Sequence, residues 1–299
     1  MNENENESRK DNEGRKKSTA AVFWRILSVI AAIGCIVCLV IIFRYLWDRY
    51  KTQKEYEDLA SQVIGENIPP AESSVPESDS TLPTQESAPL STHSINFEEL
   101  WEINPEIYAW IQVPGTKIDY PIAQREGEDQ DYYLTHTIYG EVQTAASLYT
   151  EKLNKKDFTD PNTVIYGHNM KNGSMFHDLR YYAAKDYFDE HSTIYIYLPD
   201  KILTYQVFAS YQYDDRHLLY SFDFEDEDVF TKYLDSVRNP RSMTGACVDK
   251  ELEITAKDRI ITLSTCVANK PEARRLVQAV LVKEEEAQYG EQTESTAAQ

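Results

Sequence analysis

The strongest pattern along the chain is an uninterrupted apolar run near its start. Residues 26–43 read ILSVIAAIGCIVCLVIIF and include no charged side chain. At about 1.5 Å of rise per residue, a helix over this run covers most of a hydrocarbon layer about 30 Å thick. A helix buried in a soluble core is the other interpretation, but apolarity on every face suits lipid better. The pattern therefore predicts one transmembrane anchor, with membrane lipid as its partner.

A cleaved signal peptide is the rival interpretation of the same run. The run is long for a signal peptide, and RYLWDRYK follows it with no small-x-small cleavage site. Six lysines and arginines precede the run and four follow it up to Lys54, which favours a cytoplasmic N-terminus. We therefore expect residues 1–25 to form a cytoplasmic tail, and the rest of the chain to lie outside the cell membrane after a single pass.

Polar, low-complexity sequence separates the anchor from the next apolar pattern. Residues 44–95 include YKTQKEYEDLASQVIGEN, which can continue as a helical stalk, and pass into PPAESSVPESDSTLPTQESAPLSTHS. The second part is rich in Pro, Ser, Thr and Glu and has little to bury, so it predicts a disordered linker. Residues 284–299 have the composition of a disordered tail. The folded domain is therefore expected over residues 96–283.

Within these limits, short apolar runs have the composition and spacing of β-strands. A short helix capped by Asn96 comes first, and turn residues separate the runs that follow. The eight runs are YAWIQV, KIDYPIA, SLYT, TVIYG, TIYIYLP, ILTYQVFASYQY, RIITLST and RRLVQAVLV. In MFHDLRYYAAKDYF and EDEDVFTKYLDSVRN, apolar residues recur at spacings of three and four, which predicts helical insertions. The domain is thus predicted to be mainly β, an eight-stranded, closed or nearly closed barrel with helical insertions.

Charge restricts the possible partners. The chain has 30 basic and 50 acidic residues, for a formal net charge of −20, which argues against binding to nucleic acid. Acidic clusters at Asp214–Asp215 and at residues 225–228 offer ligands for calcium, although a solvated helix start explains the second cluster equally well. We expect neither a metal nor a cofactor.

The four cysteines divide into two pairs. Cys35 and Cys38 fall inside the apolar run, where they act as small apolar residues, whereas Cys247 and Cys266 lie outside it. An extracytoplasmic location permits a disulfide between the second pair. Cys266 ends the strand-like run ITLSTC. A thiol in such a place is either an inert apolar group or, with a base or cation nearby and partial exposure, a nucleophile.

Two further residues are placed where they can serve such a nucleophile. His168 directly follows the strand-like run TVIYG, so a rigid element ends where its imidazole begins. Period-two alternation along RRLVQAVLV puts Arg274 and Gln278 on one face and Arg275 on the other, more apolar face. Gln278 suggests that the first face meets solvent or a groove. This favours Arg274 as an active-site residue, with Arg275 as a solvated or stem-packing side chain.

These motifs resemble a known family. TLSTC, with an arginine opening the following strand, resembles the signature of the sortase cysteine transpeptidases, and IYGHNMKNGSMF resembles the histidine segment of their class B members. VPGTKIDYPIAQ and DYYLTHTIYG also resemble stretches upstream of that histidine. The resemblance covers roughly residues 96–283, and implies an eight-stranded barrel with a long helical insertion over residues 211–248. One departure is TAASLYTEK, where many relatives have a glycine-containing turn and an aspartate.

The resemblance also implies roles for individual residues. Cys266 would be the nucleophile, His168 the proton carrier and Arg274 the group that stabilises the oxyanion or positions the substrate. Ser264, on the same strand face as Cys266, and Asn169, beside His168, are weaker candidates for substrate binding. Asn169 alternatively orients the histidine or accepts a hydrogen bond in a turn, and Ser264 alternatively fills the groove.

The implied reaction is transpeptidation at the membrane surface. The enzyme would cleave a C-terminal sorting signal on secreted proteins through a thioacyl intermediate, and would transfer the acyl group to an amine of a peptidoglycan precursor, a pilin or another protein. Two alternatives remain at this point. One is an extracytoplasmic cysteine peptidase that only hydrolyses its substrate. The other is a catalytically silent surface adhesin or assembly scaffold in which Cys266 is bonded to Cys247.

Overall fold

The computed structural model describes residues 3–66, 93–143, 146–240 and 245–287. The chain divides into two compact units, Met1–Lys54 and Glu55–Gln299. Most of the predicted linker and most of the predicted C-terminal tail lie outside the described residues.

The first unit consists of helix. Helix α1 spans Glu3–Val63, and its part from Leu27 onward contains an eighteen-residue window with a mean hydropathy of 2.7, none of which is buried. Trp24, Tyr45 and Trp47 are also exposed. By length and composition, this helix is able to cross a membrane.

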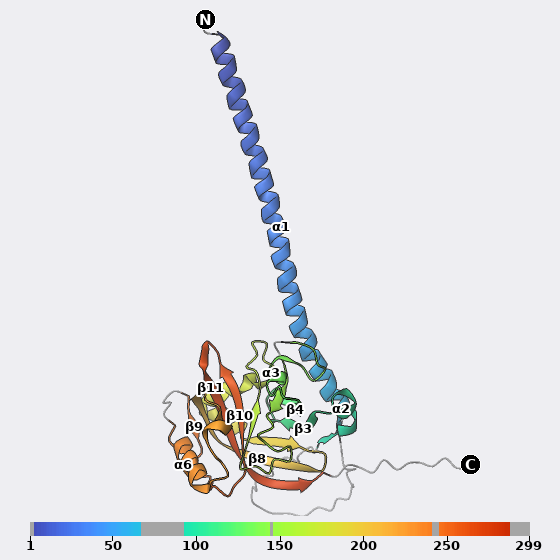
Figure 1. Ribbon diagram of the computed structural model, residues 1–299, viewed down its shortest axis with the longest axis vertical. Helices are drawn as coiled ribbons and strands as arrows, with labels where there is room; N and C mark the ends of the chain where they lie inside the picture. The colour runs from blue at the N-terminus through green and yellow to red at the C-terminus, as the bar shows by residue number, and fades with distance from the viewer. Residues whose placement is uncertain (1–2, 67–92, 144–145, 241–244, 288–299) are drawn as a thin grey trace, which may run out of the picture. The chain divides into compact units, whose positions relative to one another are not determined.

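The second unit is built on a closed barrel (Figure 1). Its strands are hydrogen-bonded in the order β11-β10-β6-β5-β4-β3-β7-β8, and pairing of β8 with β11 closes the ring. The eight strands are β3 Ile107–Gln112, β4 Asp119–Gln124, β5 Leu148–Thr150, β6 Asn162–Tyr166, β7 Thr193–Tyr197, β8 Lys201–Asp214, β10 Ile260–Val267 and β11 Lys270–Glu286. Each coincides with one of the eight predicted runs, so the predicted barrel is confirmed.

Two small pairings complete the β structure. Strand β9, Cys247–Val248, adds to the edge of β8, and β1, Ile64–Glu66, pairs with β2, His93–Ile95. Neither was predicted. These strands are too short for an alternation of apolar and polar residues to be recognised in the sequence.

The helices lie in the connections between strands. They are α2 Phe97–Ile103, α3 Tyr132–Thr135, the 3₁₀ helix η1 Phe176–Ala183, α4 Lys185–Glu190, α5 Leu218–Ser221 and α6 Glu227–Arg238. Asn96 caps α2 as predicted, because its side chain accepts a hydrogen bond from the Glu99 N–H at 3.2 Å. Asp226 caps α6 in the same way, accepting from two backbone N–H groups. The first predicted helical insertion, MFHDLRYYAAKDYF, is not one continuous helix, because it forms the two separate helices η1 and α4.

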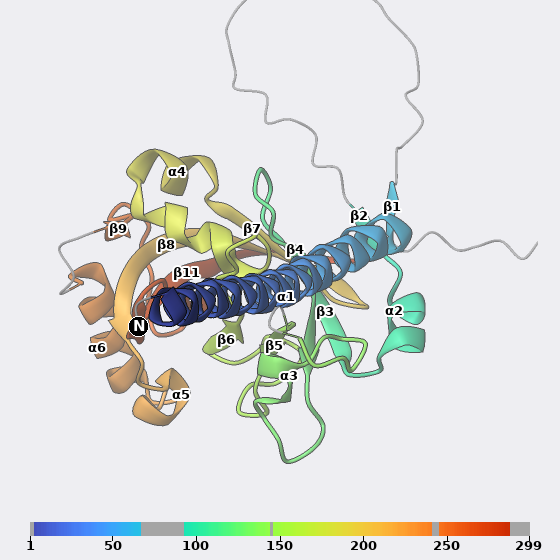
Figure 2. The ribbon, with the colours of Figure 1, turned by 90° about the horizontal axis from the view of Figure 1, so that it is seen from above.

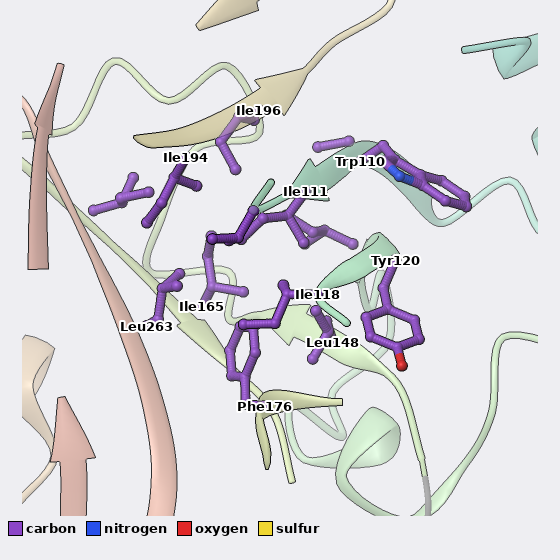
Figure 3. Close-up of a cluster of buried hydrophobic side chains, with 14 of the residues drawn as sticks. Trp110, Ile111, Ile118, Tyr120, Leu148, Ile165, Phe176, Ile194, Ile196 and Leu263 are labelled. Atoms are coloured by element: carbon purple, nitrogen blue, oxygen red, sulfur yellow. The ribbon is translucent and has the colours of Figure 1, made fainter. Parts of the chain in front are cut away.

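Apolar side chains from all sides fill the interior of the barrel (Figure 3). Ile111, Ile165, Ile196 and Leu263 are fully buried there and come from four different strands. Phe176, at the start of η1, packs into the same cluster. This core fixes the strands that lead to the candidate site.

Helix α6 lies beside β8 on the outside of the barrel (Figure 2). A second core of buried side chains lies between α6 and the barrel strands. Phe230 and Tyr233 of α6 pack there with side chains of β8, β10 and β11. Gln278 is fully buried beneath them, donating to the Tyr233 hydroxyl at 2.7 Å and to Thr262 Oγ1 at 2.8 Å. The expectation that Gln278 faces solvent or a groove is therefore wrong, because a helical layer covers both it and its neighbours.

The packed unit extends beyond the predicted limits of 96 and 283. Tyr56 and Leu59, near the end of α1, are buried in the barrel core, and the Tyr56 hydroxyl lies 3.1 Å from Ser147 Oγ. At the other end, β11 continues to Glu286 and pairs there with Lys201.

Candidate active site

The strand register brings the three candidate residues to one end of the barrel. β10 and β11 are antiparallel, and Cys266 is directly paired with Arg274. β6 runs parallel to β10, with Tyr166 paired with Ser264, and the Gly167 N–H continues this ladder by donating to the Ser264 carbonyl at 3.1 Å. This register, continued along both segments, places His168 beside Cys266.

Tight packing explains the glycine before the histidine. A Cβ atom at Gly167 would lie 2.3 Å from Leu148 Cδ2 and 2.6 Å from Phe176 Cδ2, closer than carbon atoms can approach. Beyond it, the His168 carbonyl accepts a hydrogen bond from the Phe176 N–H at 2.9 Å, and Asn169 forms a β-bridge with Met175. The backbone that carries the imidazole is thus fixed on both sides.

Hydrogen bonds define which nitrogen of His168 can exchange a proton. Nε2 lies 2.7 Å from the Leu134 carbonyl oxygen. A carbonyl only accepts, so Nε2 carries a proton, and Nδ1 is the nitrogen that can gain or lose one. The Asn169 side chain donates to the Cys266 carbonyl at 3.0 Å and so links the histidine loop to the cysteine strand.

Cys266 is an exposed, free thiol at the end of β10. The strand register shifts directly after it, between Cys266 and Val267, and Asn269 in the turn has a φ of 61°. Irregularities of this kind change the direction in which side chains at strand ends point. Cys247 is also free, but it is buried. The disulfide considered between the two is not formed, which removes the structural basis of the silent scaffold.

The two arginines at the start of β11 have different surroundings. Arg274 is half-buried, and its Nη1 donates to the carbonyls of Pro271 at 2.7 Å and Ala273 at 3.2 Å. Nε and Nη2 of Arg274 have no hydrogen-bond partner among the described residues, so they can still donate. Arg275 is 5% exposed, and its Nη1 donates to the Gly245 carbonyl at 2.6 Å and to Ser210 Oγ at 3.4 Å. Of the two interpretations of Arg275, the solvated side chain is wrong, because Arg275 is buried and bonded to the Gly245 backbone, and the packed side chain is the one that the structure has.

One cavity of about 230 Å³ includes all three candidates. Ser264, buried in β10, also lines it, whereas Asn169 is not among its lining residues and instead holds the cysteine backbone. Several other lining residues were not predicted from the sequence: Asp131, Leu134, Tyr149, Glu151, Tyr213, Asp215, Arg216 and His217. Of these, Glu151 could have been proposed from the sequence, because it is a carboxylate that directly follows the strand β5.

Glu151 and His217 form a hydrogen-bonded pair in this cavity. His217 Nε2 lies 2.6 Å from Glu151 Oε2 and 3.3 Å from the Tyr166 hydroxyl. Burial raises the pKa of the Glu151 carboxyl. His217 also caps α5, since its Nδ1 accepts from the Tyr220 N–H at 3.3 Å.

The acidic clusters that were considered for calcium have local partners. Asp214 forms an ion pair with Arg216, and Asp226 caps α6. In the described part of the chain, no group of three or more His, Cys, Asp or Glu side chains is arranged to hold a metal ion.

Comparison with known proteins shows the family to which this fold and sequence belong. The sequence model of the Sortase domain matches residues 111–282. Sortase B of Listeria monocytogenes is 36% identical over 186 residues, which cover 62% of this chain and 73% of that protein. The crystal structure of sortase B from B. anthracis in complex with AAEK1 has a TM-score of 0.61 at 27% identity, covering 80% of this chain and 99% of the other. The Staphylococcus aureus sortase B–substrate complex has a TM-score of 0.55 at 28% identity, covering 62% and 84%. The chain therefore belongs to the sortase family of cysteine transpeptidases and is a class B-like member.

Proposed function

We propose that the chain is a membrane-anchored sortase that cleaves a C-terminal sorting signal on secreted proteins and joins the new acyl end to an amine. The observation that carries this proposal is the single cavity lined by Cys266, His168 and Arg274. A nucleophile, a proton carrier and a fixed donor for an oxyanion are the groups that acyl transfer needs.

The first half of the reaction forms the thioacyl enzyme. The Cys266 thiolate attacks the carbonyl carbon of a threonine-like residue, a C–S bond forms, and the negative charge moves to the carbonyl oxygen. The free Nε and Nη2 donors of Arg274 stabilise this oxyanion. The C–N bond then breaks, and the departing amine takes the proton held by His168 Nδ1.

The second half transfers the acyl group. An incoming amine, having lost one proton to solvent, attacks the thioester carbon while neutral His168 accepts the second proton at Nδ1. The C–N bond forms, the C–S bond breaks, and Cys266 leaves as a thiolate. The imidazolium–thiolate pair is restored. The acceptor is proposed to be a peptidoglycan precursor or a pilin, both of which carry a primary amine.

The apolar part of α1 supports a location at the membrane. In this proposal residues 26–43 span the bilayer with the N-terminus in the cytoplasm, and the barrel lies outside. Tethering holds the enzyme where secreted substrates emerge and lipid-linked precursors reside, which raises their effective concentration without any new contact.

Product analysis tests the proposal. The full-length protein in detergent micelles is incubated with a library of labelled candidate sorting peptides, with and without an amine acceptor, and Cys266→Ala serves as the control. We expect a Cys266-dependent amide product that needs the acceptor. Exclusive hydrolysis at saturating acceptor would instead support the cysteine peptidase. Equal turnover by Cys266→Ala would refute both.

A further inference from the structure

The end of helix α1 is packed against the part of the barrel that carries His168. Tyr56 is 3% exposed, and Leu59 and Val63 are buried with it in the core of the barrel. All three belong to the same compact unit as the candidate site. The Tyr56 side chain makes two separate contacts there, one through its hydroxyl and one through its ring. Each contacted residue is bonded to a segment that holds His168.

The hydroxyl contact supports the carbonyl that binds the imidazole of the site. The Tyr56 hydroxyl lies 3.1 Å from Ser147 Oγ. Ser147 donates from its N–H and its hydroxyl to the carbonyls of Tyr133 and His136, both at 3.2 Å. Leu134 lies between these two residues, and its own carbonyl oxygen is 2.7 Å from the imidazole Nε2. The position of this carbonyl therefore depends on Ser147 and on the hydroxyl beside it.

The ring contact supports the backbone on the other side of His168. The Tyr56 and Tyr120 rings meet edge to face, with centroids 5.6 Å apart and planes at 84°. The Tyr120 hydroxyl accepts a hydrogen bond from the Met175 N–H at 3.2 Å. The next N–H, that of Phe176, donates to the His168 carbonyl at 2.9 Å. Tyr120 and Phe176 lie in the same cluster of buried side chains (Figure 3).

Met175 needs this support because its backbone is strained. Its φ of 56° and ψ of −132° lie in a region that residues with a side chain rarely adopt. Such a conformation costs about 1–3 kcal/mol and persists only where the surrounding structure holds it. Met175 is 2% exposed, and its N–H bond to Tyr120 is one of the contacts that hold it. Loss of the Tyr56 ring would free Tyr120 to move and would weaken this support.

We propose that Tyr56, at the end of helix α1, is a positioning residue for His168. It supports the Leu134 carbonyl on one side of the imidazole and the Met175 backbone on the other. This inference rests on the proposed function, because the position of His168 affects the reaction only if His168 carries the proton. A misplacement of about 1 Å can cost about 100-fold in rate. Loss of the Tyr56 contacts should therefore slow acylation without weakening peptide binding.

The test compares Tyr56 with a tyrosine in similar surroundings elsewhere in the barrel. Tyr197 of β7 is 4% exposed, its hydroxyl donates to Gln112 Oε1 at 3.1 Å, and its ring contacts that of Tyr195. None of these three residues lines the cavity of the site. The full-length protein in micelles, with isotope-labelled histidine, is prepared as wild type, Tyr56→Phe, Tyr56→Ala and the controls Tyr197→Phe and Tyr197→Ala.

Four quantities are measured for each protein. They are Tm, the rate of acyl-enzyme formation at saturating sorting peptide, the half-saturating peptide concentration, and the NMR signal of the His168 ring, which is assigned with His168→Ala. We expect Tyr56→Phe, which keeps the ring, to slow acylation about threefold, and Tyr56→Ala to slow it at least about tenfold. The half-saturating concentration should stay the same, and the His168 signal should shift in both Tyr56 variants.

The Tyr197 variants should lose Tm to a similar degree but keep both the acylation rate and the His168 signal. If Tyr56→Ala fails to fold, Tyr56→Phe decides the test. A His168 signal that is unchanged in the folded Tyr56 variants, or rate losses of the same size in the Tyr197 variants, would overturn the inference. A wild type that forms no acyl-enzyme, or a His168→Ala variant that acylates at the wild-type rate, would instead refute the proposed function.

Discussion

Substitution of the two adjacent arginines of β11 should separate catalysis from stability. Arg274 lines the cavity and keeps free donors, so Arg274→Ala should lower kcat/KM about 100-fold or more, as loss of an oxyanion donor does. Its two hydrogen bonds go to carbonyls of its own turn, at Pro271 and Ala273. We therefore expect Tm to change by no more than about 2 °C.

Arg275→Ala should have the opposite effect. The substitution leaves the Gly245 carbonyl and the Ser210 hydroxyl without their donor, and a hydrogen bond to a charged group contributes about 1.5–3 kcal/mol. Burial lowers the pKa of the Arg275 guanidinium, so removal of the buried charge offsets part of this loss. A net loss of about 2 kcal/mol corresponds to a fall in Tm of about 4–8 °C for a unit of this size.

Both variants are measured by the same pair of assays, thermal melting and peptide cleavage in the full-length protein. Activity is compared at a temperature well below the Tm of both variants, so that unfolding does not contribute to the rates. An Arg275→Ala variant that keeps its Tm but loses activity more than Arg274→Ala would refute the reasoning. That result would mean that Arg275, and not Arg274, reaches the reacting oxygen.

Three further predictions follow from individual contacts. Alkylation of the denatured protein without reductant should label all four cysteines, whereas native Cys266 should react faster than buried Cys247; a mass two alkyl groups short would reveal a disulfide. Asn169→Ala removes the hydrogen bond to the Cys266 carbonyl, so acyl-enzyme formation in quenched-flow mass analysis should slow about fivefold, and an unchanged rate would show that this link has no role. Burial alone would raise the pKa of the Glu106 carboxyl, but hydrogen bonds from Tyr133 and its other neighbours outweigh it and hold the pKa below the ordinary value of 4.5. Its stabilising contribution is therefore present above that value and lost as pH falls, so the stability deficit of Glu106→Gln in melts between about pH 7 and pH 3 should shrink toward acid; a constant deficit would contradict this.

The barrel could be predicted because its strands leave a local signal. Each of the eight runs is rich in β-branched and aromatic residues, bounded by turn residues, and this pattern needs no knowledge of the partner strand. The ends of the strand-like runs TVIYG, at Gly167, and ITLSTC, at Cys266, were also visible in the sequence. They placed His168 and Cys266 at strand ends before any register was known.

The two faces of β11 could not be assigned correctly, because both are buried. Val277 faces the barrel core, while Gln278 lies beneath α6 in a network of tyrosine and threonine hydroxyls. A polar residue on a strand normally indicates solvent, but here it satisfies buried partners. Arg275 is covered in a similar way. The preference for Arg274 thus rested on an incorrect premise, although Arg274 does line the cavity.

The pairing of Glu151 with His217 was also beyond the sequence. The two residues are 66 positions apart and meet only because the segment that carries α5 returns to the end of β5. Nothing in the residues around His217 distinguishes a cap from a group that lines a cavity. Contacts of this kind depend on how the barrel closes, which local patterns do not encode.

The most direct test of the account is the position of the acyl group on the enzyme. The full-length protein is quenched with acid during turnover of a sorting peptide, digested, and mapped by mass spectrometry. The account predicts a thioester on the fragment that contains Cys266, with none on Cys247. An acyl group on any other residue, or cleavage of the peptide with Cys266 unmodified at every time point, would contradict it.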